Sequence, residues 1–417
     1  MSSLTNLSLC LPRPSSKTPH APPAIATSTI ETQLPPNHIV VKVDRFGFSA
    51  NNVTYQALGE QPHFRYYDFH PAPTASNASP QTHGLVPVWG FGTVVASSHP
   101  KIPLGERIYG YLAPCRYLLL PVSPSDVNKH AFYVPRPHLP ADRRPYNQII
   151  RCANDPQYTA TPQGEDLTML YRPLFWTSYW FDDWLHSLRY RGANKILISS
   201  ASAKTAFCAA YLFGKRRERG ETRKDLELVG LTSKKNLAFT KGLRLYDSVQ
   251  TYDDALPKGN AGEIWLYVDV AGNDELNARI LAHFASIEAD LAGAFALGLT
   301  NITPSSSAAS SVFNARPTTK TFAAKASLGA TPTELEPFFM PEWLDIRKHQ
   351  LSLTEIFERQ KTAWAELMRD CVGWVRIEHV KGAEGVKSAY ERIRREGVGA
   401  EVGEIWSLWD GEEKAKL

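Results

Sequence analysis

The sequence predicts an α/β protein in which a doubly wound parallel sheet follows a β-rich N-terminal half. The first observation is the stretch from Lys195 to Lys235, which reads as strand, tight turn, helix and strand. Its apolar runs are Ile196 to Ile198 and Leu226 to Leu231, and between them Ala206 to Phe213 has apolar residues at helical spacing. The second observation is that strand-like and helix-like segments keep alternating after this unit. Such alternation is typical of a parallel sheet with helices on both faces.

The third observation concerns the N-terminal half, where short strand-like runs are punctuated by glycines. The runs V-P-V-W-G-F-G-T-V-V and E-R-I-Y-G-Y are of this kind, and they favour a small β-barrel. Residues 12–36 contain seven prolines and predict an extended, loosely packed lead-in. Residues 301–334 are rich in Ser, Thr, Ala and Pro and predict a connection. Residues 341–371 predict one long amphipathic helix, and strand, helix and strand are expected after it.

Length and composition narrow the classes of protein and partner. A chain of 417 residues is too long for one ordinary core, so two domains are expected. A net charge of +4 gives no sign of a nucleic-acid partner, and no apolar run is long enough to cross a membrane. The five cysteines are few, odd in number and widely spaced, which favours a reducing compartment, so a cytoplasmic location is expected. The expected partner is a small-molecule substrate, and a homodimer is left open.

The turn between the first strand and its helix is the candidate site for a dinucleotide pyrophosphate. A fingerprint turn reads G-x-G-x-x-G, but here residues 200–205 read S-A-S-A-K-T and contain no glycine. The hydroxyls of Ser200, Ser202 and Thr205, the ammonium of Lys204 and the helix amides are suited to phosphate. The alternative is a degenerate turn that binds no cofactor.

The end of the second strand indicates which dinucleotide is bound. An NAD site carries an acidic residue there for the ribose 2′-hydroxyl. This chain has Thr232, Ser233, Lys234 and Lys235 instead, and these side chains suit a 2′-phosphate. The sequence therefore favours NADP(H) over NAD(H), although two lysines near a helix start are also typical of a solvated surface.

The chain also resembles a known superfamily. The segments E-R-I-Y-G-Y at 106–111 and E-I-W-L-Y-V-D-V-A-G at 263–272 resemble strands of the medium-chain dehydrogenases/reductases. A-N-N-V-T-Y at 50–55 and R-P-L-F-W-T-S at 172–178 resemble, more closely, a domain-of-unknown-function branch of that superfamily, zinc-independent and similar to quinone oxidoreductases and enoyl reductases. The resemblance implies a GroES-like β-barrel domain and a Rossmann-type sheet that binds nicotinamide cofactor. It assigns 1–36 as the lead-in, 37–165 as the GroES-like substrate domain, 166–335 as the cofactor domain and 336–417 as a segment returning to the substrate domain.

The resemblance further implies roles for four residues. Thr177 matches a threonine at a helix start that faces the nicotinamide, but it is equally compatible with a helix cap. Asn51, Asn52 and Tyr55 match polar active-site positions of the zinc-free reductases. In that reading Tyr55 donates a proton to a developing enolate or alkoxide oxygen, while Asn52 orients the carbonyl. In the alternative reading the two asparagines form a turn and Tyr55 packs in the barrel wall.

Two enzyme functions remain open from the sequence. The first is a zinc-independent NADPH-dependent oxidoreductase that reduces an activated C=C or C=O bond of a fairly apolar small molecule. No cysteine and histidine set with zinc spacing is visible, so no metal is expected. The second is a redox-neutral isomerase or dehydratase with a degenerate or structural cofactor site, which the missing glycines favour. A non-catalytic binding protein would leave the polar A-N-N-V-T-Y segment unexplained.

Overall fold

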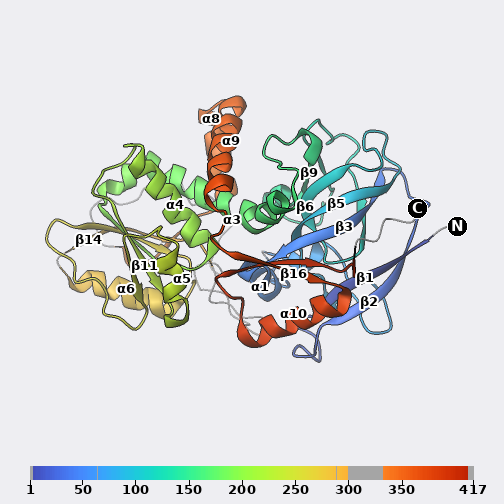
Figure 1. Ribbon diagram of the computed structural model, residues 1–417, viewed down its shortest axis with the longest axis horizontal. Helices are drawn as coiled ribbons and strands as arrows, with labels where there is room; N and C mark the ends of the chain where they lie inside the picture. Colours follow the sequence, from blue (N-terminus) through green and yellow to red (C-terminus); the bar gives the residue numbers. More distant parts are fainter. Residues whose placement is uncertain (1–2, 63, 288, 299–331, 412–417) are drawn as a thin grey trace. The chain divides into compact units, whose positions relative to one another are not determined.

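The computed structural model describes residues 3–62, 64–287, 289–298 and 332–411 (Figure 1). These residues form two compact units. One unit combines residues 3–170 with residues 360–411, and the other combines residues 171–298 with residues 332–359. The connection predicted over 301–334 lies almost entirely outside the described residues.

The second unit is built on a six-stranded sheet in which all neighbouring strands are parallel. Its order is β12-β11-β10-β13-β14-β15. Strands β11 and β12 are added on one side of β10 and strands β13 to β15 on the other, so the strand order reverses between β10 and β13. The predicted parallel sheet is therefore confirmed, and the bounds of the two predicted strands Ile196 to Ile198 and Leu226 to Leu231 agree to within one residue. The bounds are β10 Lys195–Ile198, β11 Glu227–Thr232, β12 Ser248–Thr251, β13 Ile264–Asp269, β14 Asp290–Ala296 and β15 Glu336–Pro337.

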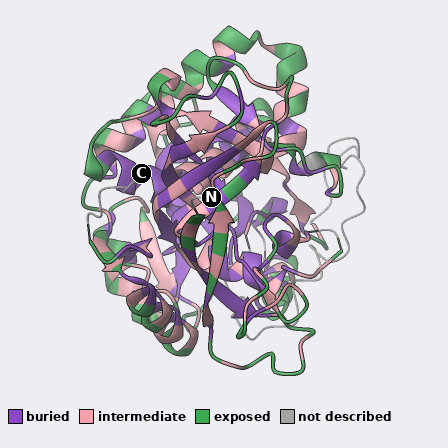
Figure 2. Cartoon of the chain, turned by 90° about the vertical axis from the view of Figure 1, so that its right-hand side faces the viewer, coloured by how far each residue is buried: buried purple, intermediate pink, exposed green. Residues whose placement is uncertain are grey.

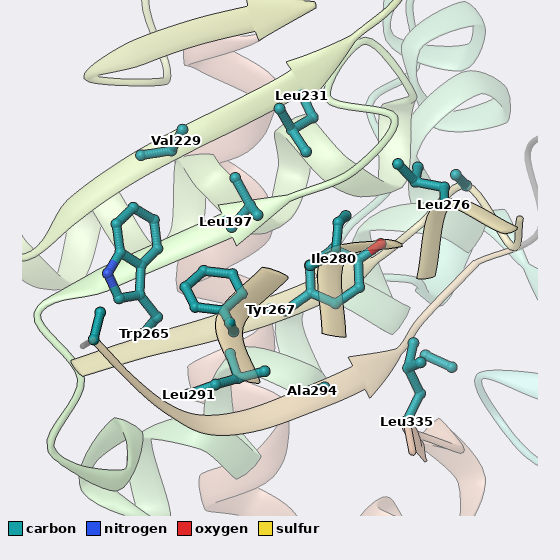
Figure 3. Packing of buried hydrophobic residues seen from close by; sticks show 14 residues of the cluster. Leu197, Val229, Leu231, Trp265, Tyr267, Leu276, Ile280, Leu291, Ala294 and Leu335 are labelled. Atoms are coloured by element: carbon teal, nitrogen blue, oxygen red, sulfur yellow. The ribbon is translucent and has the colours of Figure 1, made fainter. Parts of the chain in front are cut away.

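Both faces of this sheet are buried, which explains why its strands read as nearly continuous apolar runs. On the face drawn in Figure 3, side chains of β10, β11 and β13 pack with helix α6, Asp274–Ser286. Tyr267 of β13 is fully buried in this cluster, together with Ile280 of α6. On the opposite face, the ring of Phe295 in β14 lies 5.8 Å from Phe181 of helix α3, Pro162–Ser187.

Two further helices cover the sheet beside β10 and β11. Helix α4, Lys204–Glu218, follows the candidate turn, and α5, Leu237–Gly242, follows a 3-10 turn at Lys234–Asn236. Phe207 of α4 contacts Phe239 of α5 edge to face at 6.4 Å. The helix predicted over 206–213 is thus present and extends further in both directions.

The first unit contains an eight-stranded sheet that is mostly antiparallel. Its strands follow the order β16-β17-β3-β5-β6-β9-β8, and β7 pairs with β3. Among the described residues β16 and β8 each pair on one side only, so no closed barrel is found. Figure 2 shows buried residues gathered on the strands and exposed residues on helices and loops. The bounds are β3 His38–Phe48, β5 Val88–Ser97, β6 Arg107–Leu112, β7 Tyr117–Pro121, β8 Ala131–Tyr133, β9 Gln148–Arg151, β16 Arg376–Lys381 and β17 Val402–Ser407.

The N-terminal segment differs from the loosely packed lead-in that its prolines predict. Strands β1, Ser3–Pro12, and β2, Ala24–Glu31, form an antiparallel hairpin, and β1 also pairs with β4, His83–Gly84. Leu9 and Leu11 of β1 are buried. The physical reason is the alternation of leucines in L-S-L-C-L, which gives β1 an apolar face, whereas most of the prolines lie in the loop between the two strands.

The helix expected over 341–371 is two helices. Helix α8, Met340–Gln350, ends before Leu351, and α9, Leu353–Asp370, begins after Ser352. Ser352 accounts for the break, because its hydroxyl accepts a hydrogen bond of 3.1 Å from the Glu355 amide and so caps α9. The strand, helix and strand expected afterwards are β16, α10, Ala383–Glu396, and β17. No described helix has the length and apolar character needed to cross a membrane.

Candidate functional site

The candidate turn lies at the carboxyl end of β10, where the order of the sheet reverses. β10 is flanked by β11 and β13, with Ile198 opposite Gly230 on one side and Val268 on the other. In open parallel sheets, ligands bind outside the carboxyl ends of the strands at such a reversal. The topology therefore places the candidate turn, residues 200–205, at the reversal point of the sheet.

The candidate turn contains no glycine, and side chains from other segments fix its conformation through hydrogen bonds. Ser200 adopts a left-handed conformation with φ of +49°, which is unfavourable for a residue with a Cβ. Its amide donates a hydrogen bond of 2.8 Å to the hydroxyl of Tyr252, just after β12. The Tyr246 hydroxyl donates to the carbonyl oxygen of Ala201 at 2.9 Å, and Asn236 Nδ2 donates to Ser202 Oγ at 3.1 Å. The turn is therefore ordered by tertiary contacts.

The first residue of α4 is Lys204, which is 8% exposed. Ala203 precedes it and provides no side-chain cap, and the first turn has no acidic residue. A cation at the positive end of a helix dipole is unfavourable for the helix alone and favours a bound anion. Ser202 is buried, and the carbonyl oxygen of Thr205 accepts a hydrogen bond of 2.8 Å from Ser178 Oγ.

The end of β11 carries the residues predicted to select the cofactor. Thr232 is 1% exposed, and within the described residues its hydroxyl has no hydrogen-bond partner. A buried hydroxyl without a partner is unfavourable, so this position suits a polar ligand. Ser233 precedes the 3-10 turn, and Lys234 and Lys235 are exposed. Lys234 Nζ lies 3.4 Å from Asp253, an acidic neighbour that the sequence did not bring to attention.

Thr177 does not lie at a helix start. Helix α3 begins at Pro162, and Thr177 is in its interior with its hydroxyl 3.4 Å from the carbonyl oxygen of Pro173. The reading of Thr177 as a helix cap is therefore wrong. The neighbouring Ser178 contacts α4 through the hydrogen bond of 2.8 Å that it donates to the carbonyl oxygen of Thr205.

Tyr55 lies on helix α1, Ala50–Ala57, in the first unit. Its hydroxyl oxygen accepts hydrogen bonds from Asn51 Nδ2 at 2.6 Å and from Trp89 Nε1 at 3.3 Å. Because both partners donate, the phenolic proton remains available for donation. Burial raises the pKa of Tyr55, and the negative charge of an ionised Tyr146 would raise it further, while the two donors act in the opposite direction. Tyr55 is therefore protonated at neutral pH and is not a base.

Asn52 has a structural role that the sequence reading missed. Its Oδ1 accepts a hydrogen bond of 2.9 Å from the Ser49 amide, and Ser49 in turn caps the helix. Its Nδ2 donates to the carbonyl oxygen of Pro87 at 3.1 Å, and the residue is 4% exposed. Both polar atoms are thus engaged within the protein, so the expectation that Asn52 orients a substrate carbonyl is corrected. The alternative expectation of a turn is also wrong, since these residues are helical.

The aromatic residues near Tyr55 form packed core. The Tyr55 ring lies 4.5 Å from that of Tyr66 and 5.4 Å from that of Tyr111. Phe69 is buried against the same cluster, with its ring 5.1 Å from Tyr111. His70 is also buried there; burial, with a smaller contribution from the Arg136 charge, lowers its pKa to about 3. It is therefore a neutral core residue.

A family model described as "Protein of unknown function (DUF2855)" matches residues 46–399. The chain belongs to this family. The match supports the resemblance found in the sequence, namely a domain-of-unknown-function branch with the fold of medium-chain dehydrogenases/reductases. No curated protein matches this DUF2855 chain in sequence.

Solved structures share the fold of the DUF2855 chain at low sequence identity. A putative NADPH:quinone reductase from Bacillus thuringiensis has a TM-score of 0.52 and 13% identity, with 97% of this chain and 99% of that one covered. An Etr1p mutant in complex with NADP and crotonyl-CoA has a TM-score of 0.51 and 13% identity, with 97% and 100% covered. The yhdH oxidoreductase from Salmonella enterica in complex with NADP has a TM-score of 0.50 and 12% identity, with 97% and 99% covered. These likenesses establish the fold.

Proposed function

We propose that this DUF2855 chain is a zinc-independent, NADP(H)-dependent oxidoreductase that reduces an activated C=C or C=O bond of a fairly apolar small molecule. The observation that carries the proposal is the start of α4. Lys204 and an uncapped helix N-terminus stand at the reversal point of a parallel sheet, and no acidic residue lies in the first turn of the helix. This arrangement suits the pyrophosphate of a dinucleotide.

The residues at the end of β11 fit the NADP form of the cofactor. No acidic residue follows β11 to bind a ribose 2′-hydroxyl, and Lys234 and Lys235 can bind a 2′-phosphate. The buried hydroxyl of Thr232 offers a further polar contact in the same place. Structures with the same fold hold NADP, and one of them holds crotonyl-CoA, whose C=C bond is activated by a carbonyl group. These points support NADP(H) and a conjugated substrate.

NADPH, when bound, supplies the hydride. The role that we assign to the protein is to hold the cofactor through the turn and α4 and to protonate the reduced substrate. Tyr55 donates its proton to the developing enolate or alkoxide oxygen, and Asn51 and Trp89 hold the phenol in place through their hydrogen bonds to its oxygen. We further propose that residues 37–165 form a GroES-like substrate domain and residues 166–335 the cofactor domain, with 336–417 returning to the first. A cytoplasmic location fits five cysteines that are all buried and free of disulfides.

The test is an NADPH oxidation assay with quinones, enones, enoyl thioesters and aldehydes. The proposal expects turnover with at least one class, and elemental analysis should find no stoichiometric zinc. Turnover that requires about one zinc per chain would contradict the zinc-free assignment. The left-handed Ser200 in a turn without glycines favours a second candidate, a redox-neutral isomerase or dehydratase. That candidate expects substrate conversion without NADPH consumption.

A further inference from the structure

A buried carboxylate joins the two strands at the reversal point of the sheet. Asp269, the last residue of β13, is 1% exposed. Its Oδ1 accepts hydrogen bonds from Ser199 Oγ at 2.8 Å and from the Gly272 amide at 3.0 Å, and its Oδ2 accepts from Asn277 Nδ2 at 2.8 Å. In the described part of the chain no Lys, Arg or His forms an ion pair with it. Hydrogen-bond donors alone therefore stabilise this carboxylate.

Ser199 connects Asp269 to the candidate turn. It is the residue between the end of β10 and Ser200, and it is fully buried. Besides donating to Asp269, its hydroxyl oxygen accepts from the amides of Val270 and Ala271 at 2.9 and 3.0 Å. The Ser199 hydroxyl thus makes three hydrogen bonds to consecutive residues, the last residue of β13 and the two that follow it. The start of the turn is fixed relative to β13 by this clamp.

A second layer holds the acceptor itself. Asn277 of α6 donates to Asp269, and its Oδ1 accepts from the Tyr267 hydroxyl at 2.7 Å. Tyr267 is buried in the core cluster between β13 and α6 (Figure 3). The position of the Asp269 carboxylate is therefore set by a strand and a helix that are themselves packed.

The turn needs such support because it lacks glycines. Ser200 lies in the left-handed region with φ of +49°, and a residue with a Cβ keeps such a conformation only where its surroundings impose it. A glycine in the turn would usually allow the turn to approach the neighbouring strand closely. Here the glycine that allows this approach belongs to the neighbouring strand. A Cβ on Gly230 of β11 would lie 2.9 Å from the Cβ of Ala201, so β11 has its glycine where the turn approaches it.

We propose that Asp269 is a positioning residue for the cofactor turn and that, through Ser199, it takes over the task of the missing glycines. This inference rests on the proposed NADP(H) site. Asp269 does not contact the cofactor in this account. It fixes the residue that precedes the turn, and the turn then places Lys204 and the start of α4 beside the pyrophosphate.

The experiment is an NADPH titration of the full chain, with a melting curve for each variant. Ser199→Ala removes the hydrogen bond to the Asp269 carboxylate and the acceptor of the Val270 and Ala271 amides, and it should weaken NADPH binding at least about 10-fold. Asp269→Ala removes the acceptor altogether and should weaken binding more. Asp269→Asn keeps Oδ1 for Ser199, and Asn277 can turn its amide to accept from the new Nδ2. That conservative variant should therefore restore most of the affinity that Asp269→Ala loses.

Asp182 provides the matched control. It is also a buried carboxylate of the second unit, 2% exposed, and accepts from the Tyr190 hydroxyl and Arg216 Nε at 2.6 Å each. These partners do not contact the turn, so Asp182→Ala should lower the melting temperature and leave the NADPH dissociation constant within about twofold. Unchanged binding by Ser199→Ala would overturn the proposal, as would an equal loss of affinity in Asp182→Ala. A wild-type chain that binds no NADPH would overturn the proposed function and this inference together.

Discussion

The side-chain amide of Asn51 donates a hydrogen bond of 2.6 Å to the hydroxyl of Tyr55, one turn further along α1. Asn51 and Trp89 both donate, so the phenol oxygen is held from two sides while its proton stays free to transfer. This contact distinguishes Tyr55 from the other buried tyrosines of the first unit. Tyr67, for example, has a buried hydroxyl without a hydrogen-bond partner in the described residues.

Tyr55→Phe should therefore reduce turnover and leave cofactor binding intact. General acid catalysis contributes typically 10²- to 10⁴-fold, so kcat should fall at least about 100-fold while the dissociation constant of NADPH is unchanged. Steady-state kinetics and a binding titration measure the two effects separately. Tyr67→Phe is the matched control and should keep wild-type turnover. If both variants retain full activity, Tyr55 is not the proton donor.

Lys234 and Lys235 should determine the preference for NADPH over NADH. Replacing both by Ala should weaken NADPH binding and leave NADH binding nearly unchanged, because only NADPH carries the 2′-phosphate. Asp253→Asn should tighten NADPH binding, since this carboxylate lies 3.4 Å from Lys234 Nζ. Lys241→Ala, at an exposed lysine of α5, serves as the control in the same titrations. Equal losses for the two cofactors would remove the 2′-phosphate assignment.

Lys204→Met tests the charge at the start of α4. Methionine keeps an apolar stem in the buried position and removes the ammonium group. A charge-assisted contact contributes roughly 1.5–3 kcal/mol, so NADPH binding should weaken about 10- to 150-fold, while the melting temperature should hardly change. A variant that binds NADPH as tightly as the wild type would show that Lys204 does not contact phosphate.

Glu165 should make the first unit sensitive to acid. Its side chain is 7% exposed and accepts hydrogen bonds from Arg45, Arg107 and Tyr158. Burial alone would raise its pKa, but the hydrogen bonds and positive charges of Arg107 and Arg45, together with Tyr158, lower it below the ordinary value of 4.5. A lowered pKa contributes stability that is complete above pH 4.5 and is lost as the pH falls through the folded-state value.

Glu165→Gln should accordingly lower stability near neutral pH, by roughly 1.5–3 kcal/mol, because it removes charged hydrogen bonds to the half-buried Arg45 and Arg107. It should also flatten the loss of stability below pH 4.5, which chemical denaturation at several pH values can measure. Glu355→Gln, at an exposed pair with Arg359, should change neither quantity. An acid profile of Glu165→Gln that is as steep as that of the wild type would contradict this account.

Elements whose signal lies in local periodicity could be predicted from the sequence. The first two strands of the parallel sheet were predicted to within one residue, and the turn at 200–205 was located because an apolar run ends there and a helical pattern begins. A second local signal, Ser352 followed three residues later by Glu355, marks the start of α9, but it was passed over in favour of one long helix. The alternating leucines of β1 were likewise outweighed by the prolines that follow them.

The details of the site depend on contacts that no local pattern contains. Asn52 is occupied by the Ser49 amide and the Pro87 carbonyl, and the second of these lies 35 residues away. Asp269 is recognisable in the sequence only as an acid at the end of an apolar strand, because its donors are a serine just after β10, a backbone amide and an asparagine from α6. Thr177 was placed at a helix start by its match to a superfamily threonine, whereas α3 begins at Pro162 and contains Pro173 and Thr177 in its interior.

The most direct test of the central claim is a binding isotherm of the wild-type chain with NADPH and, separately, with NADH, followed by the change in cofactor fluorescence. The account predicts saturable binding of NADPH with one cofactor per chain and distinctly weaker binding of NADH. Absence of NADPH binding, or a preference for NADH, would contradict it.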